Sequence, residues 1–67
     1  MLQGMVSGIA GLRWVSYVRV DDRGPDQVRY TAVGVGHRRP AEVRIGEPTA
    51  HRLAGKVPFV PVRRSAV

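Results

Sequence analysis

The absence of cysteine is the strongest constraint on how this short chain can fold. A domain of about 60 residues buries only about 60% of the surface that its unfolded chain exposes, so small domains often rely on disulfides or bound metal. The 67 residues include no Cys, which excludes disulfides and thiolate metal sites. Stability must therefore come from apolar packing in one core, alone or together with a partner.

The apolar residues of this core favour strands. Val outnumbers the large apolar side chains, and β-branched residues pack well on a sheet. Trp14 is expected in the core, because one large aromatic supplies much of the buried area of a small domain. The large apolar residues are Leu12, Trp14, Tyr17, Tyr30, Ile45, Leu53 and Phe59.

Two alternating segments separated by a turn signal predict a β-hairpin. Residues 12–20 are apolar or β-branched at most positions, and residues 27–35 alternate between apolar and polar side chains. Between them, residues 21–26 read Asp-Asp-Arg-Gly-Pro-Asp, in which Gly, Pro and Asp each favour chain reversal for a different reason.

The rest of the chain predicts a third strand, a short helix and an edge strand. Residues 41–45 alternate, with Val43 and Ile45 pointing inward. Residues 47–55 begin with Glu-Pro and end with Gly, as helices do, but two turns are stable only when packed. Residues 57–62 contain two prolines, which cannot donate ladder hydrogen bonds, so this segment belongs at a sheet edge.

The expected architecture is α+β, a small three- to four-stranded, mainly antiparallel sheet with one short helix in the order β-β-β-α-β. We expect a single compact domain over residues 12–64, a flexible glycine-rich lead-in over residues 1–11 and a frayed end over residues 65–67. Met1 and Met5 both fit the start of translation.

No segment has the pattern of a membrane span or a secretory signal. The longest weakly polar stretch, residues 1–12, is too short and is interrupted by glycines. The first basic residue, Arg13, follows that stretch instead of preceding it. We therefore expect a cytoplasmic protein with no membrane partner.

The formal net charge of +6 predicts an acidic partner, either nucleic acid or an acidic protein surface. Lys56 is the only Lys among 11 basic residues, and this Arg excess, with abundant Val, Gly and Ala, fits the coding bias of a high-GC genome. Guanidinium groups still bind phosphate and carboxylate bidentately and stack on aromatic rings. Composition alone does not choose between the two partner classes.

The candidate catalytic and metal-binding residues lack a functional spacing. Ser, Thr and the carboxylates are scattered, and Thr49 and His51 would lie on different faces of the short helix. His37 and His51 stand fourteen positions apart with no Cys, which is a poor ligand set. Gly34-Val35-Gly36 is not followed by the helix that a phosphate loop requires. We expect no catalytic residue, no metal and no cofactor, and thus no enzyme.

The first strand is expected to be apolar on both faces. One face carries Leu12, Trp14, Ser16, Val18 and Val20. The other carries Val15 and Tyr17 between Arg13 and Arg19, and a chain of this size has little left to cover it. This second face predicts a partner surface. In the alternative, Tyr17 packs under the helix and the arginine stems cover apolar surface.

His37-Arg38-Arg39 forms a second basic feature, in a loop between strands. It would bind phosphates or an acidic protein face, while a solvated loop is the simpler alternative. The predicted partner-binding residues are Arg13, Val15, Tyr17, Arg19, Arg29, His37, Arg38 and Arg39.

The last third of the chain resembles small accessory proteins of high-GC actinobacteria and their phages. The residues that carry the resemblance are Val43-Arg44-Ile45, Pro48-Thr49-Ala50, Arg52-Leu53-Ala54 and Val57-Pro58, in strand, helix and strand order. The resemblance transfers no site residues. It implies a short accessory protein, often phage-encoded, that acts by binding a host macromolecule.

These features predict a non-enzymatic interaction module that binds and modulates a protein partner, such as a phage or prophage protein acting on a host protein. A homodimer through the second face or a strand edge would cover the same spare surface. The alternatives are a basic nucleic-acid-binding protein that contacts phosphates through arginines, and a structural subunit. Acidic residues that segregate from the arginines would favour nucleic acid, and interspersed ion pairs would favour a protein.

Overall fold

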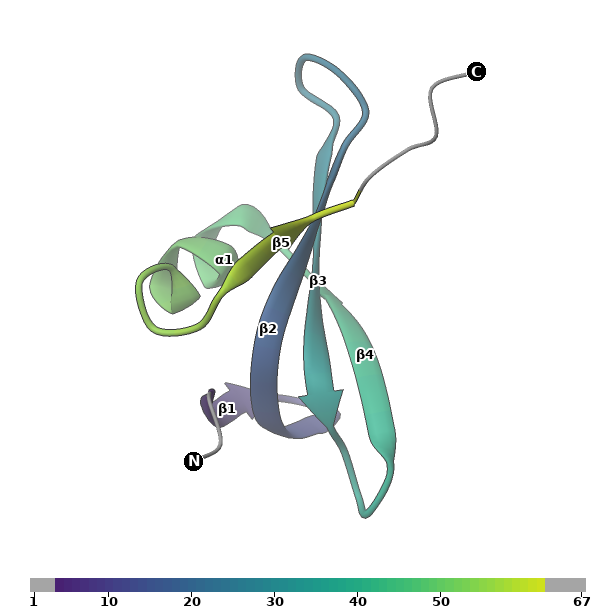
Figure 1. Ribbon diagram of the computed structural model, residues 1–67, viewed down its shortest axis with the longest axis vertical. Helices are drawn as coiled ribbons and strands as arrows, with labels where there is room; N and C mark the ends of the chain where they lie inside the picture. The colour runs from purple at the N-terminus through teal and green to yellow at the C-terminus, as the bar shows by residue number, and fades with distance from the viewer. Residues whose placement is uncertain (1–3, 63–67) are drawn as a thin grey trace.

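The computed structural model describes residues 4–62 and contains one five-stranded sheet with a short helix beside it (Figure 1). The elements are β1 (Met5–Ile9), β2 (Leu12–Asp22), β3 (Val28–Val35), β4 (Pro40–Ile45), α1 (Glu47–Leu53) and β5 (Phe59–Pro61). Strands β1 to β4 form an antiparallel meander, and β5 pairs in parallel with β2. The α+β class, the predicted hairpin and the single short helix are confirmed.

Strand β1 corrects the predicted strand count and order. It pairs with the first part of β2, in a stretch where the sequence predicted only a lead-in. The buried Ser7 hydroxyl stabilises the turn between β1 and β2, because it donates to the Leu12 carbonyl and accepts from the Ile9 N–H at 3.0 Å. The observed order is β-β-β-β-α-β. The end expected to fray, residues 65–67, lies outside the described residues.

Two short strands share one edge of β2, and β4 forms the opposite edge of the sheet. β1 pairs with Val15 and its neighbours, while β5 pairs with residues 18–20. The Val18 N–H donates to the Pro58 carbonyl at 2.9 Å, so a proline serves at this edge as an acceptor. The predicted edge position of the C-terminal strand is confirmed.

The helix α1 covers one face of the sheet, which we call the inner face. Leu53 of α1 and Val57 of the following turn reach the core, and Val43 and Ile45 pack against it as predicted. The buried core residues are Leu12, Val15, Val18, Ala32, Leu53 and Val57. The opposite side of the sheet, which we call the outer face, has no helix over it in the described part of the chain (Figure 1).

A β-bulge in the middle of β2 changes which side chains share a face. Val15 pairs with Gly34 of β3, but Tyr17 pairs with the adjacent Val33, so Ser16 has no partner of its own. One unpaired residue shifts the alternation of a strand by one position. Trp14 and Val15, directly before the bulge, therefore lie on the face opposite to the one that alternation counted back from Val18 predicts.

This bulge overturns two assignments made from the sequence. Val15 shares the inner face with Val18 and is 0% exposed, so it belongs to the core and not to a partner surface. Trp14, predicted in the core, shares the outer face with Tyr17 and is only half-buried. The single Trp of the chain is thus a surface feature.

Candidate interaction surface

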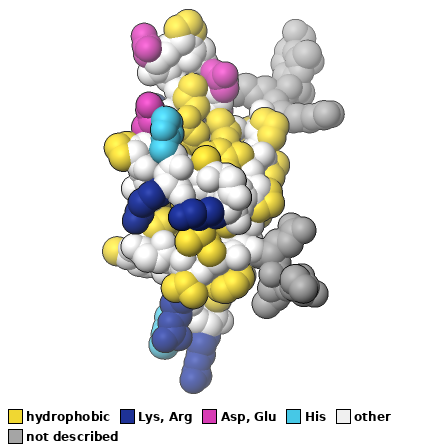
Figure 2. All heavy atoms as spheres, turned by 90° about the vertical axis from the view of Figure 1, so that its left-hand side faces the viewer, with side chains coloured by type: hydrophobic (Ala, Val, Ile, Leu, Met, Phe, Trp, Pro, Cys, Tyr) yellow, Lys and Arg dark blue, Asp and Glu magenta, His cyan; other side chains and the backbone are white. Residues whose placement is uncertain are grey.

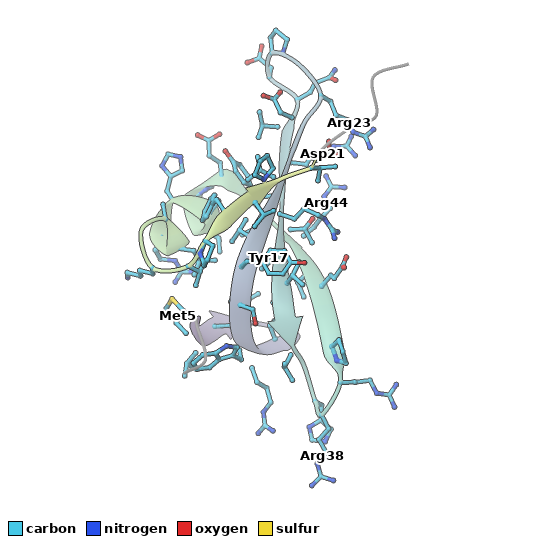
Figure 3. The ribbon with its side chains drawn as sticks, in the orientation of Figure 1. Met5, Tyr17, Asp21, Arg23, Arg38 and Arg44 are labelled. Atoms are coloured by element: carbon cyan, nitrogen blue, oxygen red, sulfur yellow. The ribbon has the colours of Figure 1, made fainter. Side chains whose placement is uncertain are left out.

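The outer face presents side chains from all five strands, in rows set by the strand register. These residues are Val6, Trp14, Tyr17, Arg19, Asp21, Arg29, Thr31, Val33, Val35, Pro40, Glu42, Arg44 and Val60. Figure 3 shows Tyr17, Asp21 and Arg44 on the side of the sheet away from α1, whereas Met5 lies on the α1 side. The rows change from apolar beside β1 to charged beside the β2–β3 hairpin.

The apolar end of the outer face combines exposed valines with two aromatic rings. Val6 is 72% exposed and Val35 is 41% exposed, while Trp14 and Tyr17 are half-buried. A Cβ atom added to Gly4 would lie 2.6 Å from the indole Nε1 of Trp14, so the ring packs directly against the backbone there. The indole is therefore held in place, and this end offers an ordered apolar surface.

An ion pair ties three strands together in the middle of the outer face. The Arg19 guanidinium on β2 donates two hydrogen bonds to the Glu42 carboxylate on β4, at 2.7 and 3.2 Å, across the intervening β3. These hydrogen bonds and the charge of Arg19 lower the pKa of Glu42, and the same contacts raise the pKa of Arg19. Bidentate geometry fixes both side chains on the outer face.

We expect the stabilisation by this pair to disappear at acid pH. The pKa of Glu42 is lower in the folded than in the unfolded chain, so the contribution is complete above the unfolded pKa and is lost as the pH falls through the folded pKa. Arg19 stays charged over this range. In thermal unfolding from pH 7 to pH 3, Glu42→Gln should lose less stability than the wild type. The matched variant Arg19→Ala should behave like Glu42→Gln, and pH profiles parallel to that of the wild type would contradict the prediction.

The β3–β4 hairpin forms a basic tip at the other end of the molecule from the β2–β3 hairpin. The Gly36 N–H donates to the Arg39 carbonyl at 2.8 Å, and His37, Arg38 and Arg39 are all exposed. Arg38 has a φ of 64°, a left-handed conformation that residues with a Cβ adopt rarely (Figure 3). Turns of this kind usually use Gly or Asn there, so a side-chain role is a reasonable hypothesis for Arg38.

The structure divides the eight predicted partner-binding residues into three groups. Those on the outer face are Tyr17, Arg19 and Arg29. Those at the basic tip and the adjoining start of β2 are Arg13, His37, Arg38 and Arg39. Val15 is in the core. The face that the sequence predicted is therefore two separate surfaces, one mixed and one basic.

Sequence reasoning missed most of the apolar outer face. Val6 falls in the predicted lead-in, and Trp14 was assigned to the core. Val33 and Val35 carried a signal, because they alternate with the inward residues of the second strand. Glu42 and Arg44 carried the same alternation signal for an outward side chain, but only the strand order brings them beside β2 and β3 residues.

Acidic residues pair with arginines on and beside the outer face, whereas residues 36–39 of the basic tip include no carboxylate. Glu42 pairs with Arg19, and Asp21 pairs with Arg23 at 2.9 Å. Figure 2 shows acidic side chains toward the β2–β3 hairpin with one His beside them, while Lys and Arg side chains lie in the middle and at the far end of the view. The interspersed pairs favour a protein partner for the outer face, and the lack of carboxylates in residues 36–39 favours an anionic ligand at the basic tip.

Two further findings concern the chain as a whole. Within residues 4–62 the one helix, α1, is far too short to cross a membrane, and no three side chains form a metal-ligating group. A comparison of the chain with protein families, curated proteins and solved structures finds no match.

Proposed function

We propose that the protein is a non-enzymatic interaction module that binds a partner protein through its outer face. The observation that carries the proposal is the one-sided cover of the sheet: α1 packs on the inner face, and three of the five exposed valines of the described residues, Val6, Val35 and Val60, lie on the outer face. Exposed apolar groups gathered on one face mark interaction sites. The adjacent Trp14 and Tyr17 belong to the residue types that dominate binding energy at interfaces.

The chemistry of the outer face defines the partner. Its apolar end would fill a shallow apolar area, while Arg29 and Arg44 are exposed at the other end. A complementary surface has an apolar centre and an acidic rim, and the net charge of +6 would steer it toward the chain. A cytoplasmic phage or prophage product that modulates a host protein would use such a surface.

Loss of either aromatic side chain should weaken this binding strongly while leaving the fold intact. The full chain carrying an affinity tag is used to capture partners from a lysate of the source organism, with and without nuclease. A partner that survives nuclease should bind Trp14→Ala and Tyr17→Ala about 30-fold more weakly, which corresponds to about 2 kcal/mol for a central aromatic.

Lys56→Ala is the matched control, because Lys56 is exposed in the turn after α1, on the other side of the sheet. It should bind the partner like the wild type. Circular dichroism confirms that each variant is folded. A partner that binds both aromatic variants as tightly as the wild type would refute the outer face as the interface.

The basic tip supports a second candidate function, binding of nucleic acid through phosphate contacts. Its specific support is the left-handed Arg38 in a hairpin whose residues 36–39 include no carboxylate. In this case nuclease removes the captured material, and the affinity for a DNA or RNA oligonucleotide falls steeply between about 50 and 200 mM salt. No oligonucleotide binding at about 50 mM salt would exclude it.

A further inference from the structure

Strand β4 forms an unpaired edge of the sheet. Among the described residues it pairs with β3 on one side and has no strand on the other, and Figure 1 shows it as the outermost strand. An edge of six residues presents backbone N–H and C=O groups to any strand that can align with it. A strand that pairs there must match both the backbone groups and the side chains of β4.

The hairpin determines which backbone groups point away from the sheet. Gly36 and Arg39 form a hydrogen-bonded pair, and antiparallel pairs alternate between hydrogen-bonded and non-hydrogen-bonded. The next pair, Val35 and Pro40, is accordingly non-hydrogen-bonded, which agrees with the missing N–H of proline. Continuing along β4, the backbone groups of the even-numbered residues 42 and 44 point to the open edge.

We propose that β4 pairs antiparallel with β4 of a second copy of this chain, about a two-fold axis at Val43. In this register Glu42 of one copy lies opposite Arg44 of the other. Both residues have outward backbone groups, so each pair exchanges two backbone hydrogen bonds. The two-fold axis passes between the two Val43 residues, which form a non-hydrogen-bonded pair.

The side chains are complementary in the same register. Glu42 and Arg44 are both exposed on the outer face, so in the dimer Arg44 of each copy joins the Arg19–Glu42 ion pair of the other copy. On the inner face, half-buried Val43 meets its own copy, and half-buried Ala41 meets Ile45. Shifting the register by two residues would lose both charge pairs, so the sequence of β4 specifies this one.

The dimer goes beyond the proposed function and does not depend on it. Because the two-fold axis is perpendicular to the sheet, both outer faces lie on the same side of one continuous sheet. A module with two adjacent outer faces would bind repeated or dimeric partners with increased avidity.

A charge exchange tests the proposal directly. Sedimentation equilibrium at about 0.15 M salt, where the repulsion between two +6 chains is largely screened, should show a concentration-dependent dimer of the wild type. Arg44→Glu places Glu opposite Glu twice and should raise the dimer dissociation constant at least tenfold. The triple variant Arg19→Glu, Glu42→Arg and Arg44→Glu restores opposite charges both across the two copies and between positions 19 and 42, and should restore the dimer.

Lys56→Glu is the matched control, because it makes the same change in net charge at an exposed site outside β4. It should dimerise like the wild type, and circular dichroism verifies the fold of every variant. A wild type that stays monomeric at millimolar concentration overturns the proposal. So does a triple variant that is as monomeric as Arg44→Glu, since the pairing would then not depend on the Glu42–Arg44 register.

Discussion

Replacing Gly34 by Ala is expected to remove a large part of the protein's stability at 25 °C. A Cβ atom on Gly34 would lie 2.8 Å from the Trp14 carbonyl carbon and 2.9 Å from the Val15 Cα. These are backbone atoms beside the bulge, so the overlap with the added Cβ is removed only if β2 and β3 move apart. Overpacking typically costs 1–3 kcal/mol, and a backbone shift places this change at about 3 kcal/mol or more. A domain of this size has only about 3–10 kcal/mol in total.

Gly46→Ala is the matched glycine control. Gly46 has a φ of −83°, and the nearest atom to an added Cβ is Pro48 Cδ at 3.7 Å, an ordinary contact. Its substitution should change the free energy of unfolding by less than about 1 kcal/mol. Urea unfolding followed by circular dichroism measures both variants. If Gly34→Ala were as stable as Gly46→Ala, the close approach of β3 to the bulge would be disproved.

The fold was largely predictable because most elements carry local signals. The turn between β2 and β3, the alternation of residues 41–45 and the Pro and Gly at the ends of α1 each act over a few residues. Strand β1 was not predictable in this way. Its glycine-rich sequence indicates a mobile segment, and it is ordered by pairing with β2 and by the buried Ser7 hydroxyl.

The candidate surface was harder to predict because one unpaired residue decides which β2 side chains lie on the inner face and which on the outer face. Alternation counted back from Val18 puts Trp14 inside and Val15 outside, and the bulge at Ser16 exchanges them. The available clue was Gly34, since a glycine within a strand often marks a bulge or a close backbone approach. Tyr17 and Arg19 were placed correctly because they follow the bulge, where the outward prediction holds.

Leu53→Ala is expected to release α1 from the sheet. Leu53 is 2% exposed and is the one large apolar side chain that this seven-residue helix contributes to the core. Leu→Ala changes in a core cost 2–5 kcal/mol, and a helix of this length is not stable by itself. Urea unfolding should show a loss in that range, and amide exchange should show α1 losing protection first.

Arg52→Ala separates this packing effect from an effect on helix propensity. Arg52 is exposed on the same helix, so its replacement should change stability by less than about 0.5 kcal/mol. Equal losses from both variants would contradict the role of Leu53. Release of α1 would also uncover Val15 and Val18, on the same strand that presents Trp14 and Tyr17 outward. Leu53→Ala should therefore lose partner binding together with its fold. Trp14→Ala should lose binding while it stays folded, and only this second result locates the interface.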